Sequence, residues 1–306
     1  MSSHFNRSFE TIKRQSVTQP MVSLSKAEIQ LWRRFIESEI GFVLPTEQLG
    51  WLVHAVEATA RSNQLSIEVL WQRMTMDPIL RQTLLDEVLI LESRFFRHPP
   101  SLDFIVNLAK ASTSNRHQSH HKPFRIWSLG CANGQEVWSL AMMLASEGID
   151  QYHILGSDVS QKALTQAKSA QYEGRTRRFI PNAYQQFLIP MIPVTSVSRQ
   201  NQTNDTLTDL PWQVSSKLQD HASFIWHNIF CDDLPTGDQD VIICQNVLIY
   251  FRKFDQRDIL TKLTQACAIG GHIILAPSEG LSWRPKNMRK VKHPLINAWQ
   301  KISDES

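Results

Sequence analysis

The periodicity of apolar residues changes once along this chain, near Pro123, and this change constrains the fold more than any other feature. From residue 24 to residue 111, apolar residues recur at the spacing that places them on one face of a helix. After Pro123, short apolar runs alternate with helical segments. This order predicts an all-helical domain followed by an α/β domain with a doubly wound, mostly parallel sheet.

The first part, residues 24–111, is expected to hold five short helices. Ser25 and Glu28 have the spacing of a capping box at the start of the first helix, and Gly41 is expected to end it. The other expected helices begin at or next to these residues: Thr46, Ser66, Asp77 and Ser101. Helices with no strand pattern between them predict a small helical bundle.

Two polar segments flank this bundle. Residues 1–23 lack periodicity and are expected to form a mobile tail, and residues 112–122 have the composition of a linker. The linker carries His117, His120 and His121, which could bind a metal ion, although no carboxylate or cysteine lies nearby. A solvated linker is the favoured interpretation, and we expect no metal site in the chain.

The second part, residues 123–306, is expected to form the α/β domain. Five strands are expected, at residues 124–129, 153–157, 223–226, 240–244 and 272–276. The helix that starts at Phe254 is expected to stop at Gly270-Gly271. Residues 174–222 interrupt the alternation, and we interpret them as an insertion with a flexible polar loop at 195–209.

Composition excludes several classes of protein. No apolar run approaches the roughly 18 residues that a membrane span needs, and the N-terminus lacks the apolar core of a signal peptide. The four cysteines show no paired spacing, as expected for free thiols in a reducing cytosol. Lys and Arg total 32 against 29 for Asp and Glu, a balance that argues against nucleic acid. We therefore expect a cytoplasmic protein with no membrane insertion and no nucleic-acid partner.

The first candidate site is the loop after the strand at 124–129, because ligands of doubly wound sheets bind beyond the carboxyl ends of the strands. Gly130 and Gly134 would let the backbone turn tightly and approach a ligand. The loop is neither a GxGxxG fingerprint nor a phosphate-binding P-loop. By itself it is equally well interpreted as a plain turn.

Asp158 ends the next strand and is the second candidate. An acidic side chain at this place can accept hydrogen bonds from both hydroxyls of a ribose. Together with the glycine loop it favours an adenosine ligand without a strong need for phosphate binding, and S-adenosylmethionine fits that description. The alternative is that Asp158 caps the helix that follows.

Polar residues also end the strand at 240–244. Gln245 and Asn246 interrupt an apolar run that resumes through Tyr250. Polar groups at the carboxyl end of a central strand face the ligand crevice. A helix start capped by Asn246 is an equally compatible interpretation.

Four motifs, in order, resemble those of the bacterial chemotaxis receptor methyltransferases, the CheR family. They are similar to the family's N-E-T-x-F-F-R, G-C-S-T-G-E-E-P-Y-S, D-I-D and C-R-N-V-x-I-Y-F patterns, and they lie at Glu92–Arg97, Gly130–Ser139, Ser157–Ser160 and Asp240–Phe251. Ser278-Glu279 further resembles the family's H-S-E. The resemblance implies a helical N-terminal domain joined to a Rossmann-like α/β methyltransferase domain that carries a small β-subdomain insertion.

The resemblance also implies an activity. The chain would transfer a methyl group from S-adenosylmethionine to glutamate side chains on the cytoplasmic helical domain of methyl-accepting chemoreceptors. The implied cofactor-binding residues are Ser93, Arg97, Gly130, Glu136, Asp158, Asn228, Ile229, Gln245 and Asn246. Arg97 and Tyr250 are the implied catalytic residues, with Arg97 orienting the acceptor carboxylate and Tyr250 shaping the pocket around the methyl group. The structural alternative for Arg97 is hydrogen bonding to carbonyls at the end of its helix.

Three residues depart from the family motifs. Leu91 replaces an asparagine, Gln135 replaces the first glutamate of G-E-E, and Gln245 replaces the arginine of C-R-N. An amide at position 245 can donate hydrogen bonds but cannot act as a bidentate cation. The C-Q-N-x-L-I-Y-F variant is similar to the branch associated with type IV pilus chemosensory systems and twitching motility.

The acceptor glutamate would lie on a long receptor helix, so we expect a surface that tolerates acidic helices. The cluster Arg175–Arg178 and basic residues of the helical domain could supply it, although a solvated basic surface is equally compatible. Phe95 and Phe96 are expected to pack between the domains rather than touch substrate. We expect the protein to be a monomer.

Two other functions remain open. A catalytically weak or inactive module that docks receptors or signalling partners would account for Leu91 and Gln245. A methyltransferase for RNA or a small molecule would fit the same fold, although the balanced charge argues against RNA.

Overall fold

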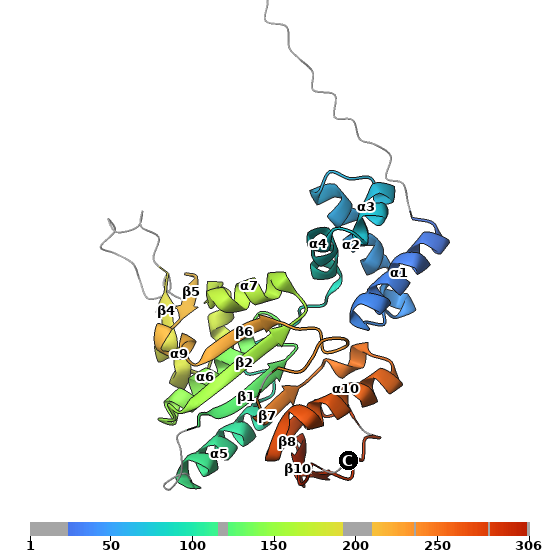
Figure 1. The fold of residues 1–306 in the computed structure, drawn as a ribbon. Coiled ribbons are helices and arrows are strands. Elements are labelled where there is room, and N and C mark those ends of the chain that lie inside the picture. Colours follow the sequence, from blue (N-terminus) through green and yellow to red (C-terminus); the bar gives the residue numbers. More distant parts are fainter. Residues whose placement is uncertain (1–23, 116–121, 192–209, 236, 281, 305–306) are drawn as a thin grey trace, which may run out of the picture.

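The computed structural model describes residues 24–115, 122–191, 210–235, 237–280 and 282–304. These residues form a group of N-terminal helices beside a larger α/β part (Figure 1). The expected tail at 1–23, the polar loop at 195–209 and the linker residues His117, His120 and His121 lie outside the described residues. Among the helices that are described, none is both long and apolar enough to cross a membrane.

The N-terminal helices pack around one buried apolar cluster, to which Trp32 and Leu52 belong. These elements are α1 (Lys26–Ile40), the short 3-10 helix η1 (Thr46–Gln48), α2 (Leu49–Ser62), α3 (Ile67–Met74) and α4 (Pro78–Val88). Ser25 and Glu28 form the predicted capping box, and Gly41 ends α1 at a φ of 70°. The start and the end of α1 are therefore confirmed.

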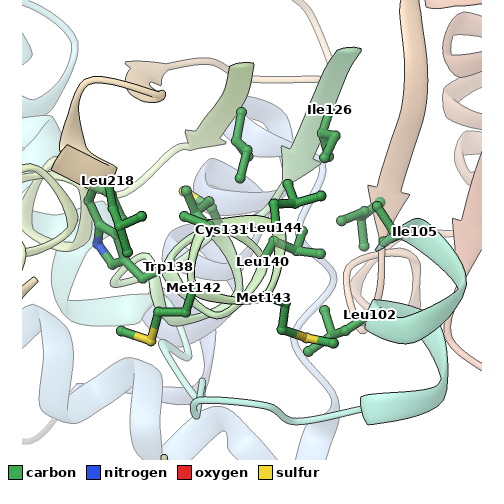
Figure 2. Packing of buried hydrophobic residues seen from close by; sticks show 14 of the residues in the cluster. Leu102, Ile105, Ile126, Cys131, Trp138, Leu140, Met142, Met143, Leu144 and Leu218 are labelled. Carbon is green, nitrogen blue, oxygen red and sulfur yellow. The ribbon is translucent and has the colours of Figure 1, made fainter. Parts of the chain in front are cut away.

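Helix α5 (Pro99–Asn115) belongs with the sheet rather than with the N-terminal helices. Its residues Leu102 and Ile105 share a buried cluster with Ile126 and Leu144 of the α/β part (Figure 2). The helix also runs to Asn115, inside the segment that the sequence assigned to a linker. A helical stripe does not reveal which surface it covers, and we propose that the boundary between the two domains falls after α4 rather than at residue 111.

Seven strands form the main sheet, in the order β6-β2-β1-β7-β8-β10-β9. Their bounds are β1 (Phe124–Leu129), β2 (Tyr152–Asp158), β6 (Ala222–Trp226), β7 (Gln239–Cys244), β8 (Cys267–Leu275), β9 (Met288–Lys290) and β10 (Asn297–Lys301). The first five strands in this order run parallel, whereas β10 is antiparallel to both of its neighbours. The predicted doubly wound, mostly parallel sheet is confirmed, whereas β9 and β10 were not predicted.

Strand β8 starts earlier than predicted. Helix α10 (Lys253–Ala266) ends directly at Cys267, so Gly270-Gly271 lies inside the strand instead of ending the helix. The pairing of β7 with β8 shifts register between Gln239 and Val241. Gly270 has a φ of 82° in the extra stretch of β8 that this shift creates. The glycine pair therefore marks an irregularity of the strand.

Helices cover both faces of the main sheet (Figure 1). One face carries α5, α6 (Gln135–Ser146) and α7 (Gln161–Ser169), and the other carries α10. Along β1, Ile126 packs in the cluster on the α6 side and Trp127 packs in the cluster on the α10 side. Burial on both faces explains why the central strands are continuous apolar runs.

The insertion forms a separate antiparallel sheet in the order β3-β5-β4. Its elements are β3 (Gln171–Tyr172), η2 (Gly174–Phe179), η3 (Asn182–Phe187), β4 (Leu188–Pro190), β5 (Trp212–Val214) and α9 (Ser216–Gln219). The sheet begins at Gln171, before the predicted start of the insertion at residue 174.

Helix α4 docks the N-terminal helices onto the α/β part. Asp86 accepts hydrogen bonds from the Ser160 hydroxyl at 2.8 Å and from the Lys162 backbone N–H at 3.3 Å. The Gln82 amide donates to the Val159 carbonyl at 2.9 Å. These contacts hold the segment after α4 over the carboxyl ends of β1 and β2.

Candidate functional site

A cavity of about 230 Å³ lies between the N-terminal helices and the carboxyl ends of β1, β2 and β7. The segment 89–98 after α4 forms one wall, and the loops that follow these strands form the other. All ten predicted site residues line it: Ser93, Arg97, Gly130, Glu136, Asp158, Asn228, Ile229, Gln245, Asn246 and Tyr250. The fold thus gathers them at the switch point of the sheet, where β1 lies between β2 and β7.

The loop after β1 requires glycine at position 130. Gly130 has a φ of 70°, and its N–H donates to the Ser157 carbonyl at 2.8 Å. A Cβ atom at this position would lie 2.4 Å from Cγ2 of Val247. The tight turn is therefore needed to bring the loops after β1 and β7 together at the cavity.

Asp158 faces the cavity from the end of β2 and is 9% exposed. Its Oδ2 accepts from the Ala132 N–H and its Oδ1 from the Ser160 N–H, both at 2.9 Å. Ser160, whose side chain accepts from the Ala163 N–H, is the N-cap of α7. The alternative interpretation of Asp158 as the cap is therefore wrong, and its carboxylate faces the cavity as a hydrogen-bond acceptor.

Burial raises the pKa of Asp158 above its ordinary value. The backbone hydrogen bonds from Ser160 and Ala132 oppose this shift, while the nearby Asp86 carboxylate adds to it. A buried carboxylate of this kind gains most from a ligand that donates hydrogen bonds to its charged form.

Glu136 lies in the first turn of α6 and, like Glu92, is a further acidic residue that lines the cavity. Its Oε1 accepts from the Ser128 hydroxyl at 2.7 Å. Burial raises the pKa of Glu136, whereas the Ser128 hydrogen bond and the charge of Arg97 oppose the shift. The cavity therefore places two carboxyl groups where a cationic or hydroxyl-bearing ligand would stabilise them.

Arg97 lines the same cavity from the segment after α4. Its Nη1 donates to the Glu92 carbonyl at 3.1 Å, and its Nη2 lies 4.0 Å from Oε1 of the same residue. The Glu92 side chain is 82% exposed, so this ion pair is weak. The structural role of Arg97 is thus one hydrogen bond to a loop carbonyl, and its side chain, 39% exposed, is accessible from the cavity.

Phe95 and Phe96 anchor this segment to the insertion. The Phe95 ring lies edge-on to Tyr172, with ring centroids 4.9 Å apart, and Phe96 stacks on Tyr184 at 5.0 Å. The Phe96 N–H donates to the Ser139 hydroxyl at 3.0 Å. Both rings thus pack against the α/β part, and because Phe96 also lines the cavity, the expectation that neither ring touches substrate stays a prediction.

Asn228 joins the cavity wall to α1. Its amide donates to the Glu39 carbonyl at 2.8 Å, and its Oδ1 accepts from the Phe230 N–H at 3.1 Å. Asn228 is 3% exposed and Ile229 is 4% exposed. Because its amide nitrogen and amide oxygen both form hydrogen bonds within the protein, Asn228 holds this part of the cavity wall in place.

Gln245, which stands where the resemblance implies an arginine, is tied to α5. Its Nε2 donates to the Ser101 hydroxyl at 3.0 Å and to the Leu275 carbonyl at 3.2 Å. The Gln245 amide therefore holds the loop after β7 against α5.

Gln135, another departure from the family motifs, has a buried Oε1 with no hydrogen-bond partner among the described residues.

Asn246 does not cap a helix, so that alternative is wrong. It adopts a left-handed backbone with a φ of 60°, and the short helix η5 (Leu248–Tyr250) has Val247 as its N-cap. The Asn246 N–H donates to Oε2 of Glu279 at 3.1 Å. The same carboxylate accepts from the N–H groups of Ala276, at 3.1 Å, and Ile249, at 3.3 Å.

Glu279 is therefore a support of the site to which the sequence analysis gave no role. It is 4% exposed, and burial raises its pKa while the backbone hydrogen bonds oppose the shift. The available signal was the Ser278-Glu279 pair, which resembles a family motif without revealing what the carboxylate contacts.

Tyr250 closes the cavity from the α1 side. Its ring stacks on Phe42 with centroids 4.7 Å apart, and its carbonyl accepts from the Val43 N–H at 2.8 Å. Burial raises the pKa of Tyr250, and the Glu92 carboxylate adds to the shift while Arg97 opposes it. Phe42, which the sequence analysis did not single out, thus fixes the orientation of this ring.

Comparison with known proteins gives one matching family, described as "CheR methyltransferase, SAM binding domain", over residues 91–296. Chemotaxis protein methyltransferase 1 of Pseudomonas aeruginosa is 26% identical over 298 residues, which cover 89% of this chain and 96% of that protein. Chemotaxis protein methyltransferase Cher2 of Pseudomonas putida is 24% identical over 294 residues, with the same coverage. The probable biofilm formation methyltransferase WspC of Pseudomonas putida is 26% identical over 271 residues, 86% of this chain and 59% of that protein.

Proposed function

The chain belongs to the CheR methyltransferase family and is a methyltransferase that uses S-adenosylmethionine, and we propose that it methylates glutamate side chains on the cytoplasmic helical domain of chemoreceptors. The observation that carries the proposal is the cavity at the switch point, which is lined by the buried Asp158, the partly buried Glu136 and the accessible guanidinium of Arg97. Two relatives that match 96% of their own length are named chemotaxis methyltransferases.

The residues of the cavity fit this cofactor. Asp158 presents a buried carboxylate that can accept hydrogen bonds from the hydroxyls of a ribose. Glu136 offers a carboxylate to the cationic methionine end. Gly130 leaves no room for a side chain, so the backbone itself forms this wall.

The acceptor needs little activation. A glutamate carboxylate is ionised at neutral pH and is already a nucleophile, so no general base is required. The cofactor supplies a methyl carbon bonded to a positively charged sulfur, which leaves as a neutral thioether. The contribution of the protein is then mainly to align the carboxylate oxygen with that methyl carbon.

Arg97 has the charge and the position for this alignment. A carboxylate that enters the cavity is repelled by Asp158 and Glu136, and a nearby guanidinium offsets that repulsion. Arg97 donates one hydrogen bond to the Glu92 carbonyl and has only a weak ion pair with the Glu92 side chain. Its other N–H groups can therefore orient the acceptor carboxylate. Tyr250, held by Phe42, limits the directions from which the acceptor approaches.

We further propose that the chain is a cytoplasmic monomer of the branch that serves type IV pilus chemosensory systems, on the strength of the C-Q-N-x-L-I-Y-F sequence at 244–251. The exposed side chain of Arg175 and its neighbours on the insertion provide positive charge toward an acidic receptor helix, although Arg175 already pairs with Glu173.

The proposal is tested by incubating the protein with S-adenosylmethionine labelled on the methyl group and a chemoreceptor cytoplasmic fragment. Wild-type protein is expected to form an ester whose label is released as methanol by mild alkali. Asp158→Ala is expected to abolish both ester formation and S-adenosylhomocysteine binding by calorimetry, whereas the surface variant Glu147→Ala keeps both. Wild-type protein that binds the receptor fragment and S-adenosylhomocysteine but forms no ester would contradict the proposal.

A further inference from the structure

The last strand of the main sheet carries a strongly basic segment far from the cofactor cavity. Residues 284–293 contain Arg284, Lys286, Arg289, Lys290 and Lys292 and no acidic residue. All five side chains belong to exposed residues. We call this segment, together with β9 at its centre, the β9 edge.

The positive charge of the β9 edge is not neutralised within the part of the chain that the structure describes. None of its five basic side chains forms an ion pair there with an Asp or Glu side chain. Arg289 donates to the neutral amide of Gln300, and Arg284 and Lys290 lie over the ring of Trp299. Uncompensated charge of one sign on one strand favours an anionic partner.

β9 is the last strand of the sheet, and no strand of the described residues pairs with its outer side. On its inner side, the Val291 N–H donates to the Ala298 carbonyl and the Ile302 N–H donates to the Asn287 carbonyl, both at 2.9 Å. In an antiparallel ladder, alternate residues turn their N–H and C=O groups to opposite edges. The N–H and C=O of Lys290 therefore point outward, where another strand could pair with them.

A hollow lies beside this edge, on the α5 side of the sheet. Phe104 and Leu108 of α5 form one side of it, and Val291 and Arg289 form the other. The Phe104 ring packs edge-on against His272 at the base, with ring centroids 5.6 Å apart. The hollow can take an apolar side chain, and three basic residues, Arg289, Lys290 and Lys292, are among those that line it.

We propose that the β9 edge binds an acidic, extended peptide segment of a partner protein as an added strand. The outward backbone groups would pair with the peptide backbone, the hollow would take one apolar side chain, and the basic side chains would contact the carboxylates. A nucleic acid could satisfy the charges but not the strand pairing, which is why a peptide fits better. This site shares no lining residue with the cofactor cavity, so it is independent of the proposed function.

The test uses fluorescence anisotropy with a fluorescein-labelled peptide of about eight alternating Glu and Val residues, a usual strand length. The full-length protein is expected to bind it, with affinity falling as NaCl rises from about 0.05 M to about 0.3 M. Lys290→Glu with Lys292→Glu is expected to weaken binding at least about tenfold. The control with the same change of charge, Lys253→Glu with Arg257→Glu on α10, is expected to leave binding unchanged.

A second pair of variants separates strand pairing from charge. Lys290→Gln removes the charge only, whereas Lys290→Pro also removes the outward N–H and is expected to bind at least about threefold more weakly than Lys290→Gln. Unchanged affinity for S-adenosylhomocysteine would show that each variant is folded. Equal binding of an alternating Glu–Pro peptide would overturn the proposal. So would tighter binding of a single-stranded oligonucleotide that displaces the Glu–Val peptide.

Discussion

Replacement of Glu279 by alanine tests how the wall of the cofactor cavity is built. The Glu279 carboxylate accepts three backbone hydrogen bonds, from Asn246 and Ala276 at 3.1 Å and from Ile249 at 3.3 Å. Two of these donors belong to the loop after β7, which lines the cavity. Glu279→Ala leaves all three N–H groups without this acceptor.

The size of the effect follows from the burial of each donor. An unmade hydrogen bond at a buried group costs about 1–3 kcal/mol. Ala276 is 3% exposed and bears the full cost, whereas Ile249 is 55% exposed, so water can replace part of its lost bond. We expect Glu279→Ala to lower the free energy of unfolding by about 3 kcal/mol. Glu279→Gln keeps one acceptor oxygen without a buried charge and should cost about 1 kcal/mol.

Urea unfolding followed by tryptophan fluorescence measures this loss, and calorimetric titration with S-adenosylhomocysteine measures the effect on the site. Asn246 loses the contact that holds its left-handed backbone, so we expect Glu279→Ala to weaken binding about tenfold, or about 1.4 kcal/mol. The exposed control Glu147→Ala should change stability by less than about 1 kcal/mol and leave binding unchanged. A destabilised Glu279→Ala that binds with wild-type affinity would refute the idea that Glu279 positions the cavity wall.

Three further predictions concern the same cavity. Gly130→Ala should weaken S-adenosylhomocysteine binding by more than about tenfold in calorimetry, because the new Cβ would lie 2.4 Å from the Val247 side chain. Gly148→Ala is the control, because Gly148 has a similar φ but a Cβ there would meet no atom within 4 Å, and it should leave binding unchanged. Tyr250→Phe keeps the stacked ring and should retain ester formation within about threefold, whereas Tyr250→Ala should lose most of it; equal loss in both would indicate that the hydroxyl acts in the reaction. Burial raises the pKa of Asp158 and Glu136, so the folded protein holds more protons than the unfolded chain just above the ordinary carboxyl pKa. The free energy of unfolding should therefore decrease as pH rises from about 4 through the raised pKa values, and urea midpoints should show a flatter pH profile in Asp158→Asn with Glu136→Gln.

The candidate site was predicted residue by residue, but its contacts were not. All ten predicted residues line the cavity. Gly130, Asp158, Gln245 and Asn246 lie at or just after strand ends that are visible in the sequence, and the other residues were implied by the resemblance to the family motifs. Asp158 and Asn246 each had two interpretations, a helix cap or a ligand-facing residue, which only the tertiary structure could separate. Ser160, two residues after Asp158, is the N-cap of α7. Asn246 adopts a left-handed backbone instead of capping a helix. Neither outcome is encoded in the local pattern, because Asp, Ser and Asn all suit both caps and ligand-facing loops.

Three features of the fold were predicted wrongly or missed because each depends on which distant segment it packs against or pairs with. Helix α5 has an ordinary apolar stripe, and the stripe does not specify whether it covers the N-terminal helices or the sheet. Strand β9 reads Met-Arg-Lys within a basic segment, so its pairing with β10 leaves no apolar alternation to detect. Gly270-Gly271 resembles a helix end but lies at a register shift between strands.

The sequence by itself determined the change from helices to a doubly wound sheet and the capping of α1, because each depends on the spacing of nearby residues. Most of the candidate cavity residues came from the resemblance to the family motifs. Only the tertiary structure decided that Glu279 supports the loop after β7, that Gln245 is tied to α5, and that β9 is the last strand of the sheet among the described residues. These features arise where segments distant in the chain meet. Their energies depend on burial and on hydrogen-bond partners, which a linear pattern does not specify.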